Sequence, residues 1–224
     1  MNALFLLKKR RISPLLSRTQ KENRMKLVIA TKNKGKIWEI RDILSNCGDI
    51  EILSSGDLID PPVVIEDGET FEDNARKKAI ALSRHAKLPA LADDSGLVVD
   101  ALGGKPGVYS ARYGGEGLGD AERNALLLKH MEKIPDGKRT ARFVCVIALA
   151  MPGGDVHIAH GSVEGEISRE PRGSGGFGYD PVFLIPELGK TMAELPMAEK
   201  NEISHRARAL KEAKRILKDI LNRA

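Results

Sequence analysis

Cysteine and aromatic residues are both scarce in this sequence of 224 residues. It contains two cysteines, and Phe, Trp and Tyr together make up 4% of it. Cys47 and Cys145 show no metal-ligand spacing, and Cys145 lies in the apolar run FVCVIALAM, so buried free thiols are predicted rather than a cysteine-based metal site. Free thiols fit a reducing compartment, and we expect a cytoplasmic protein.

A basic surface is also lacking outside the N-terminal segment. The formal net charge is +5, but residues 1–24 contain seven Lys and Arg residues against one Glu, so the rest of the chain is close to neutral. Proteins that bind nucleic acids owe much of their affinity to a basic face, and single strands stack on aromatic side chains. The neutral body and the few aromatic residues therefore argue against a nucleic-acid partner.

The N-terminal segment lacks a long apolar run. Residues 3–7 are too few for a signal-peptide core or a membrane span, so no membrane partner is expected. The Arg- and Ser-rich composition of residues 1–24 is also typical of an organelle transit peptide, and a start codon placed upstream of Met25 would give the same pattern. We predict a disordered basic extension over residues 1–24, followed by a single domain over residues 25–224.

The first part of that domain alternates strand-like and helical segments. Short β-branched apolar runs predict strands, and apolar residues at helical spacing predict helices, one of which begins with Thr70 and Asp73 as a capping box. The predicted strands are residues 26–31, 89–94 and 96–102, and the predicted helices are residues 36–48, 70–85 and 120–134 with Asp120 as a cap.

The second part of the domain has β character. Residues 141–167 predict a hairpin, because the turn sequence PGGD at residues 152–155 lies between two apolar runs, and a hairpin pairs its strands antiparallel. A Gly-rich loop at residues 169–186 and one closing helix containing Ile203 and Ile220 follow. Strand–helix units in front of a hairpin predict an α/β fold with a mixed β-sheet.

The sequence TKNKGK at residues 31–36 joins a predicted strand to a predicted helix N-terminus. Free backbone N–H groups and the helix dipole favour an anion there, and a phosphate chain is the natural ligand. The loop is not a Walker A motif, since Ala30 stands where glycine is needed and Ile37 where a hydroxyl is needed. Taken alone, the motif also fits a solvated lysine-rich turn.

Two adjacent carboxylates, Asp93 and Asp94, lie inside strand-like sequence. A triphosphate normally arrives with Mg²⁺, which is bound by one or two carboxylates together with phosphate oxygens and water. Neighbouring side chains on a strand face opposite ways, so one carboxylate is predicted to face the site and the other to brace the loop. Glu66, Asp67 and Glu69 are candidates for a second carboxylate ligand. A helix-start or turn role remains the alternative for each acid.

The sequence GSGGFGYDP at residues 173–181 combines glycines, aromatic residues and an acid. Glycines let the backbone approach a ligand, Phe177 or Tyr179 can stack on a base, and Asp180 can accept a hydrogen bond from a base or sugar. The alternative is a surface loop whose aromatic side chains pack back into the core. Near a later helix start, Lys200 and the pair at residues 205–206 offer donors for a base carbonyl, unless they simply face solvent.

Four segments of the chain together resemble the inosine triphosphate pyrophosphatase family. They are IATKNKGKIWEI, ADDSGLVVDALGGKPGVYSARYGG, REPRGSGGFGYDPVF and ISHRARAL, and they occur in order over residues 25–221. The resemblance implies a Mg²⁺-dependent hydrolase that converts ITP, dITP or XTP to the monophosphate and pyrophosphate and so cleans the nucleotide pool. It also implies a homodimer with an elongated mixed β-sheet flanked by helices, and a central substrate cleft between two lobes.

The resemblance also implies a role for individual residues. Asp94 is similar to the family's catalytic carboxylate and metal ligand, and Glu66 to the second metal ligand, while water attacks the α-phosphorus. The substrate-binding residues that it implies are Thr31, Asn33 and Lys36 in the phosphate loop, Ser95 beside the acids, Phe177, Gly178, Tyr179 and Asp180 in the base loop, and Lys200, His205 and Arg206 around the purine.

Two other functions remain open at this point. A pyrophosphatase for modified pyrimidine triphosphates would share the phosphate loop and the metal-binding acids but would invert the base preference. A non-catalytic nucleotide-sensing module would bind the same ligands without turnover. The acid pair beside a phosphate loop favours an enzyme over a sensor, since sensing alone does not need a metal site.

Overall fold

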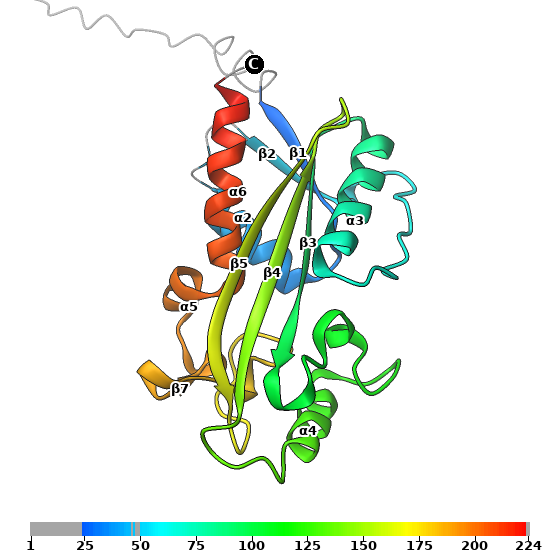
Figure 1. Ribbon diagram of the computed structural model, residues 1–224. Helices are drawn as coiled ribbons and strands as arrows, with labels where there is room; N and C mark the ends of the chain where they lie inside the picture. The colour runs from blue at the N-terminus through cyan, green and yellow to red at the C-terminus, as the bar shows by residue number, and fades with distance from the viewer. Residues whose placement is uncertain (1–23, 46, 48–49, 223–224) are drawn as a thin grey trace, which may run out of the picture.

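The fold is described from a computed structural model for residues 24–45, 47 and 50–222 (Figure 1). The predicted N-terminal extension, apart from Arg24, lies outside these residues, and so does Gly48, the predicted stop of the first helix. Within the described ranges, no helix is both long and apolar enough to cross a membrane.

In the part of the chain that the structure describes, seven strands form one mixed sheet in the order β2-β1-β3-β4-β5-β6-β7. The strands are β1 (Met25–Ile29), β2 (Ile50–Ser54), β3 (Ala90–Val99), β4 (Thr140–Ala150), β5 (Val156–Ile167), β6 (Phe183–Ile185) and β7 (Lys190–Thr191). β1 pairs in parallel with β2 and β3, and every later pair is antiparallel. The predictions of an α/β fold with a mixed sheet and of a hairpin, β4–β5, are confirmed.

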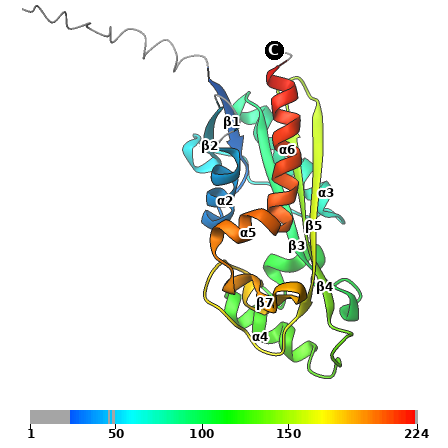
Figure 2. The same cartoon turned by 90° about the vertical axis from the view of Figure 1, so that its left-hand side faces the viewer.

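Helices cover both faces of this sheet. They are α2 (Lys34–Leu44), α3 (Phe71–Ala86), α4 (Asp120–His130), α5 (Met197–Ile203) and α6 (His205–Leu221). α2 and α6 pack together on one face, and α3 packs on the other (Figure 2). The alternation of side chains along a strand explains the two layers, because Leu91 of β3 packs in the core beneath α6 and its neighbour Ala92 packs beneath α3.

The long strands β3, β4 and β5 extend the sheet toward α4 and give the molecule its elongated shape (Figure 1). A second hydrophobic core lies at that end, where Leu127 and Met131 pack against Phe143 of β4 and Phe183 of β6. The predicted substrate cleft would lie between this core and the core beneath α6.

One predicted break in the sheet is wrong. Residues 89–94 and 96–102 were expected to form two strands, but β3 runs without interruption from Ala90 to Val99. Gly96 has another purpose in this strand: a Cβ added there would overlap the hydroxyl of Ser110 and the carbonyl of Gly107. Glycine therefore allows the following loop to cross closely over β3.

Helix boundaries also differ from the predictions. The first helix begins at Lys34 rather than at residue 36, because the Asn33 side chain accepts a hydrogen bond from the Lys36 amide (3.1 Å) and caps it. Asp120 is the first residue of α4 rather than its cap, and the Gly119 amide donates to Glu122 (2.6 Å) instead. The predicted Thr70 cap of α3 is confirmed, since its hydroxyl accepts from the Asp73 amide.

The closing segment forms two helices rather than one. α5 ends at Ile203, and Ser204 then caps α6 by accepting a hydrogen bond from the Ala207 amide (3.2 Å). This break sends α6 off in a new direction, with residues 205–206 in its first turn beside the sheet (Figure 2). β2 was not predicted, although it pairs along its whole length with β1.

Candidate functional site

Two adjoining cavities bring the predicted site residues together. The first, of about 190 Å³, is lined by the base loop and by residues of α5 and α6, and the second, of about 390 Å³, by the phosphate loop and the acids. Asn33, Lys36 and Ser95 line both. Each of the thirteen residues to which the resemblance assigns a role lines at least one of the two cavities, so segments far apart in the chain form one site.

The phosphate loop is preformed by its own side chains. The Thr31 hydroxyl accepts a hydrogen bond from the Asn33 amide (3.2 Å), and Asn33 in turn caps α2. The loop therefore presents the positive end of α2 and the Lys36 side chain to the second cavity. The Lys36 ammonium forms an ion pair with Asp93, which holds it beside the strand.

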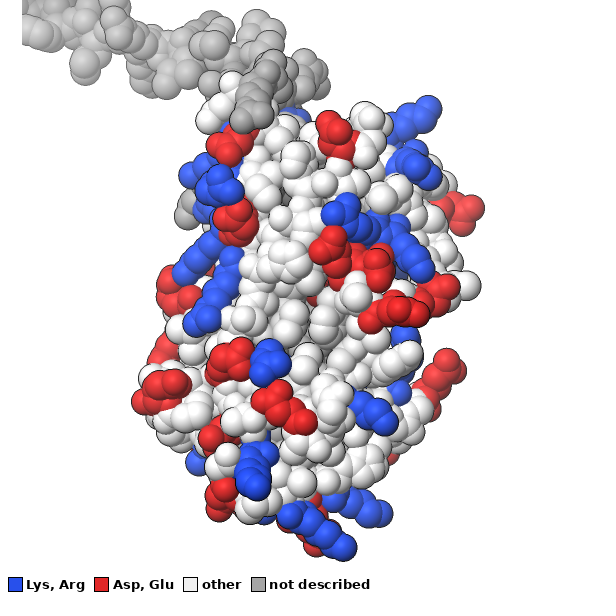
Figure 3. Space-filling view, in the orientation of Figure 1, with Lys and Arg blue, Asp and Glu red and all other residues white. Residues whose placement is uncertain are grey.

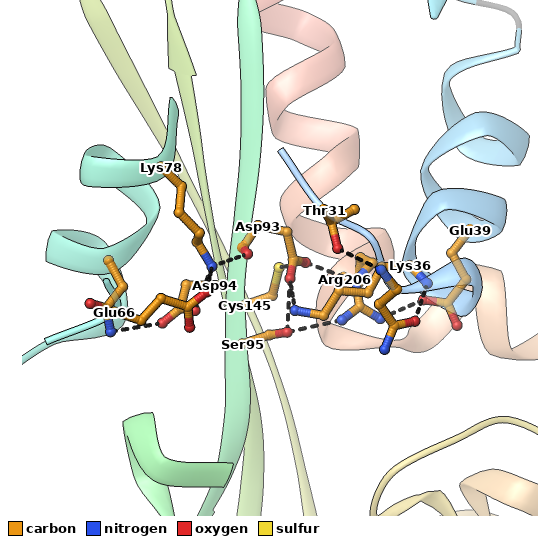
Figure 4. A network of polar contacts seen from close by, with 12 residues as sticks. Thr31, Lys36, Glu39, Glu66, Lys78, Asp93, Asp94, Ser95, Cys145 and Arg206 are labelled. Carbon is orange, nitrogen blue, oxygen red and sulfur yellow. Dashed lines mark hydrogen bonds and ion pairs between the residues drawn. The ribbon is translucent and has the colours of Figure 1, made fainter. Parts of the chain in front are cut away.

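The two adjacent aspartates lie on opposite faces of β3 (Figure 4). Asp93 points toward α2 and α6, whereas Asp94 points toward α3, as the strand geometry predicted. Their environments differ in kind, because Asp93 is enclosed by cations and small donors while Asp94 borders the cavity that also contains Glu66.

Asp93 is a buried, ionised anchor. Arg206 Nε donates to one carboxylate oxygen (2.8 Å) and the Ser95 hydroxyl to the other (3.0 Å), and Lys36 and the Cys145 thiol contact it as well. Burial raises the pKa of Asp93, but the charges of Arg206 and Lys36 outweigh burial and hold that pKa well below its usual range. Asp93 therefore fixes a residue of α2 and a residue of α6 to the same strand.

Asp94 lies beside a lysine that the sequence analysis did not identify. Lys78 Nζ is 2.8 Å from Asp94 Oδ1 and 3.1 Å from Glu66 Oε1, and it also donates to the Asp93 carbonyl (2.8 Å). Burial raises the pKa of Asp94, and Lys78 offsets this effect only in part. The pKa of Lys78 is itself raised, because burial is outweighed by its two carboxylates. One cation thus joins both acids.

Glu66 is the one of the three candidate acids that the fold brings to Asp94. Arg112 donates to the Glu66 carbonyl (2.8 Å) and so fixes this segment beside α3. Asp67 instead pairs with Lys77 on the surface (2.6 Å). Of the three candidates that the sequence left open, Glu66 is therefore the acid that lies beside Asp94 and Lys78.

Asn74 fixes the Glu66 segment to Asp94 directly. Its side-chain oxygen accepts from the Gly68 amide (2.8 Å) while its nitrogen donates to Asp94 Oδ2 (3.3 Å). Asn74 and Lys78 lie on the buried side of α3 among its apolar residues, and this placement of polar residues is the sequence signal that could have identified both.

The carboxylate oxygens around Lys78 are suitable ligands for a hard divalent cation that is bound together with phosphate. Among the described residues, no group of three or more His, Cys, Asp and Glu side chains is arranged to hold a metal ion. Asp94 and Glu66 nevertheless converge on one positive charge, and Mg²⁺ is characteristically bound by one or two carboxylates with substrate phosphates and water. This pair of carboxylates fits Mg²⁺.

The base loop closes the first cavity with Phe177. The ring packs against Gly35 of α2, where an added Cβ would lie 2.7 Å from it, and it faces Lys200 Nζ at 4.9 Å from the ring centroid. Tyr179 is instead packed in the core and donates to the Ser110 carbonyl (3.0 Å). Tyr179 is thus held in the core, whereas Phe177 lies between α2 and Lys200.

A chain of buried opposite charges crosses behind this cavity. Arg206 uses its three guanidinium nitrogens on Asp93, Glu39 and Ser95, and Lys200 contacts both Glu39 (3.0 Å) and Asp180 (2.7 Å). Glu39, which is buried, was missed from the sequence, although its place one turn after Lys36 on the first helix was a signal. Each of these buried charges is paired with an opposite charge, as buried charges require.

His205 is buried and neutral, rather than solvent-facing. It stacks on Phe143, with ring centroids 4.7 Å apart, and burial together with the nearby Arg206 holds its pKa well below the usual range. Within the described structure, its buried Nδ1 atom has no hydrogen-bond partner. His205 thus has an unused polar atom, and its side chain lines the first cavity.

Comparison with known proteins agrees with this geometry. The description of a family model that matches residues 27–216 is "Ham1 family". A dITP/XTP pyrophosphatase of Desulforamulus reducens is 55% identical over 193 residues, which are 86% of this chain and 96% of that protein. A dITP/XTP pyrophosphatase of Geobacter sulfurreducens is 56% identical over 185 residues, which are 83% of this chain and 92% of that protein.

Solved structures give the same result for the fold. A HAM1 protein from Coxiella burnetii superposes with a TM-score of 0.80 at 43% identity and covers 87% of this chain and 99% of its own. The Ham1 protein of Staphylococcus aureus superposes with a TM-score of 0.78 at 40% identity, with 87% and 98% covered. The resemblance found in the four motifs therefore extends over the whole domain.

Proposed function

The chain belongs to the Ham1 family, and from this membership and the two joined cavities we propose a nucleoside triphosphate pyrophosphatase for noncanonical purine nucleotides. Its substrates are ITP, dITP and XTP, and its products are the nucleoside monophosphate and pyrophosphate. The observation that carries the proposal is the sharing of Asn33, Lys36 and Ser95 by the cavity with the acids and the cavity with Phe177. A base and a phosphate chain can thus be bound at once.

On the phosphate side, the positive end of α2 and Lys36 offset the charge of the triphosphate while water attacks the α-phosphorus. Asp94 is the catalytic carboxylate in this proposal, and Asn74 and Lys78 hold it toward the cavity. Asp94 and Glu66 would hold Mg²⁺, which when bound neutralises charge on phosphate oxygens.

On the base side, we assign recognition of the 6-keto group to His205. A neutral imidazole donates a hydrogen bond from one of its two nitrogens, and the His205 side chain lines the first cavity. ATP carries a 6-amino group, whose N–H donors would face the N–H donor of His205, so neither group would be paired. An unpaired buried polar group costs about 1–3 kcal/mol, which disfavours ATP. Phe177 would stack on the base in front of Lys200 and Arg206.

The proposal is tested by pyrophosphate release with Mg²⁺ from ITP, XTP, dITP, GTP, ATP and dTTP, with the wild type beside Asp94→Asn. We expect fast release from ITP, dITP and XTP, slow release from ATP and GTP, and a loss of at least about a hundredfold in kcat in the variant, the usual size for such a group. Normal turnover by Asp94→Asn would remove its catalytic role.

The same assay separates the alternative functions. Preferential release from pyrimidine triphosphates would favour a pyrimidine-directed enzyme, and ITP binding without any release would favour a nucleotide sensor. Equal rates on all six substrates would retain the pyrophosphatase chemistry but discard base reading by His205.

We further propose a homodimer, as the resemblance implied, and a cytoplasmic location, as the cysteines indicated. Two free cysteines, both buried, support a reducing compartment. Light scattering coupled to gel filtration is expected to give about twice the chain mass of 24.4 kDa, and a mass equal to that of one chain would refute the dimer.

A further inference from the structure

The base loop is attached to a helix that lies outside all four motifs of the resemblance. The Gly178 amide donates to Asp120 Oδ2 (2.7 Å), and the Gly178 carbonyl accepts from Asn124 Nδ2 (3.0 Å). Asp120 and Asn124 are one turn apart and lie on the same face of α4. Both backbone polar groups of one loop residue are therefore held by one helix.

Gly178 is a position where the loop needs such support. Its φ of 63° lies in the left-handed region, and the residues on either side carry the contacts that shape the first cavity. Phe177 precedes it and packs on Gly35, and Tyr179 follows it and is fixed to Ser110. A change at the Gly178 peptide would therefore rotate Phe177 relative to the cavity.

α4 is a firm support for this attachment. Leu127 of α4 is fully buried in the core at this end of the sheet, and Met131, which follows the helix, is buried with it. Asn124 is 4% exposed, so its contact with the loop is shielded from water. Asp120 itself lines the first cavity beside Arg123, with which it pairs at 3.1 Å.

We propose that Asp120 and Asn124 are positioning residues for base recognition, which hold the Gly178 peptide so that Phe177 forms one wall of the base cavity. The inference rests on the proposed function, since it assigns the first cavity to the base. It concerns the base and not the phosphates: neither residue lines the second cavity, which contains Asp94 and Glu66.

The test uses Asn124→Ala and Asp120→Ala, with Asp120→Asn as the conservative variant. The Asn side chain keeps an oxygen that can accept from the Gly178 amide but removes the charge that pairs with Arg123. Lys129→Ala is the matched control, because Lys129 lies on α4 at a different surface, beside Glu132 and Arg169. Each protein is assayed for ITP turnover and for competitive inhibition by inorganic tripolyphosphate, a phosphate chain without a base.

We expect both alanine variants to raise the KM for ITP about tenfold, the size of one lost hydrogen bond, while kcat stays within about twofold. The inhibition constant of tripolyphosphate should not change. The KM of Asp120→Asn for ITP should lie closer to that of the wild type than to that of Asp120→Ala. If the two residues only stabilised the fold, the variants would have a lower melting temperature, but the KM for ITP would not rise while the inhibition constant of tripolyphosphate stayed the same. An unchanged KM, or an equal loss of ITP and tripolyphosphate affinity, would overturn the inference.

Amide hydrogen exchange separates this inference from the proposed function. In the free protein, residues 173–181 should exchange faster in both alanine variants than in the wild type and in Lys129→Ala. If the alanine variants exchange faster but the wild type does not hydrolyse ITP, the proposed function is refuted while the attachment of Gly178 to α4 is retained. Normal ITP turnover by the wild type with unchanged exchange in the variants would refute the attachment alone.

Discussion

At the scale of single residues, the adjacent carboxylates Asp93 and Asp94 have opposite electrostatic environments. The cations around Asp93 hold its pKa down despite complete burial, whereas burial raises the pKa of Asp94 despite Lys78. The ionised form is therefore favoured by the fold at Asp93 and disfavoured by it at Asp94. Under the proposed function, a stability role and a chemical role are thus divided between two neighbours on one strand.

The same substitution at these two positions should have contrasting effects. Asp93→Asn takes the carboxylate partner from Lys36 and leaves the buried Arg206 with Glu39 alone. Loss of one partner from a buried pair costs about 3–5 kcal/mol of unfolding free energy. Asp94→Asn relieves a disfavoured charge, and Lys78 keeps Glu66 as a partner, so stability should be retained while activity is lost. Urea unfolding measures both, and equal destabilisation would contradict the division of roles.

A second residue-scale prediction concerns pH. The folded state holds His205 neutral, whereas a histidine in the unfolded chain titrates near about pH 6.5. Below that pH the unfolded chain binds a proton that the folded chain does not, so stability falls as the pH decreases, by up to about 1.4 kcal/mol per unit.

His205→Gln removes this titration and serves as the comparison. The free energy of unfolding in urea should therefore decrease more steeply for the wild type than for the variant between pH 6.5 and pH 5. Parallel curves for the two proteins would show that the folded chain accepts the proton without cost, contrary to the buried position of the ring.

How far the site could be predicted depended on where its residues lie. Residues in loops and at strand ends, such as Asn33 and Asp180, could be predicted because they belong to short motifs whose residue types suit a ligand. Glu39 and Lys78 were missed because a charged residue within a helical pattern usually faces solvent. Their burial depends on which side of each helix meets the sheet, and this is decided by contacts distant in sequence.

At the scale of elements, the close approach of α6 to β5 positions residues 205–206. Gly161 of β5 lies beneath the first turns of this helix, where an added Cβ would overlap the carbonyl of His205 and the amide of Ala209. Because these are backbone atoms, the overlap can be relieved only by moving the helix. The position of Arg206 against Asp93 thus depends on a glycine in a different strand.

Gly161→Ala should destabilise the protein by about 1–3 kcal/mol, the usual cost of overpacking, and should raise the KM for ITP because α6 moves. Gly153→Ala is the matched control: Gly153 lies in the turn between β4 and β5, and nothing lies within 4 Å of a Cβ added there. Thermal unfolding and ITP kinetics of the two variants give the comparison. Equal stabilities would show that α6 tolerates the added methyl group.

Elements were predicted well where a local signal defines them. The Thr70 cap and the PGGD turn each act within a few residues, and both predictions are confirmed. β2 was missed and β3 was divided because pairing with β1 and the crossing of Ser110 over Gly96 are tertiary contacts. Sequence periodicity does not contain these contacts.

At the scale of the whole molecule, the folded domain and the N-terminal segment differ in charge. Acidic and basic side chains are interspersed over the face in Figure 3, and an uncharged area lies in the upper part of its centre. Residues 2–23 contain six Lys and Arg residues and one Glu, and the family match begins only at residue 27. Both cavities are lined by residues from Ala30 onward.

Removal of residues 2–23 should therefore leave kcat/KM for ITP within about twofold of the full chain. Any binding of the full chain to nonspecific DNA should weaken when residues 2–23 are removed, and the binding should depend less steeply on salt. Each phosphate contact contributes about one unit to the slope of log affinity against log salt, and removal takes away six basic residues. ITP assays and DNA titrations at 50 and 200 mM salt, run on both proteins, measure these effects. Unchanged DNA binding after removal would place a basic surface on the folded domain and contradict its near-neutral charge.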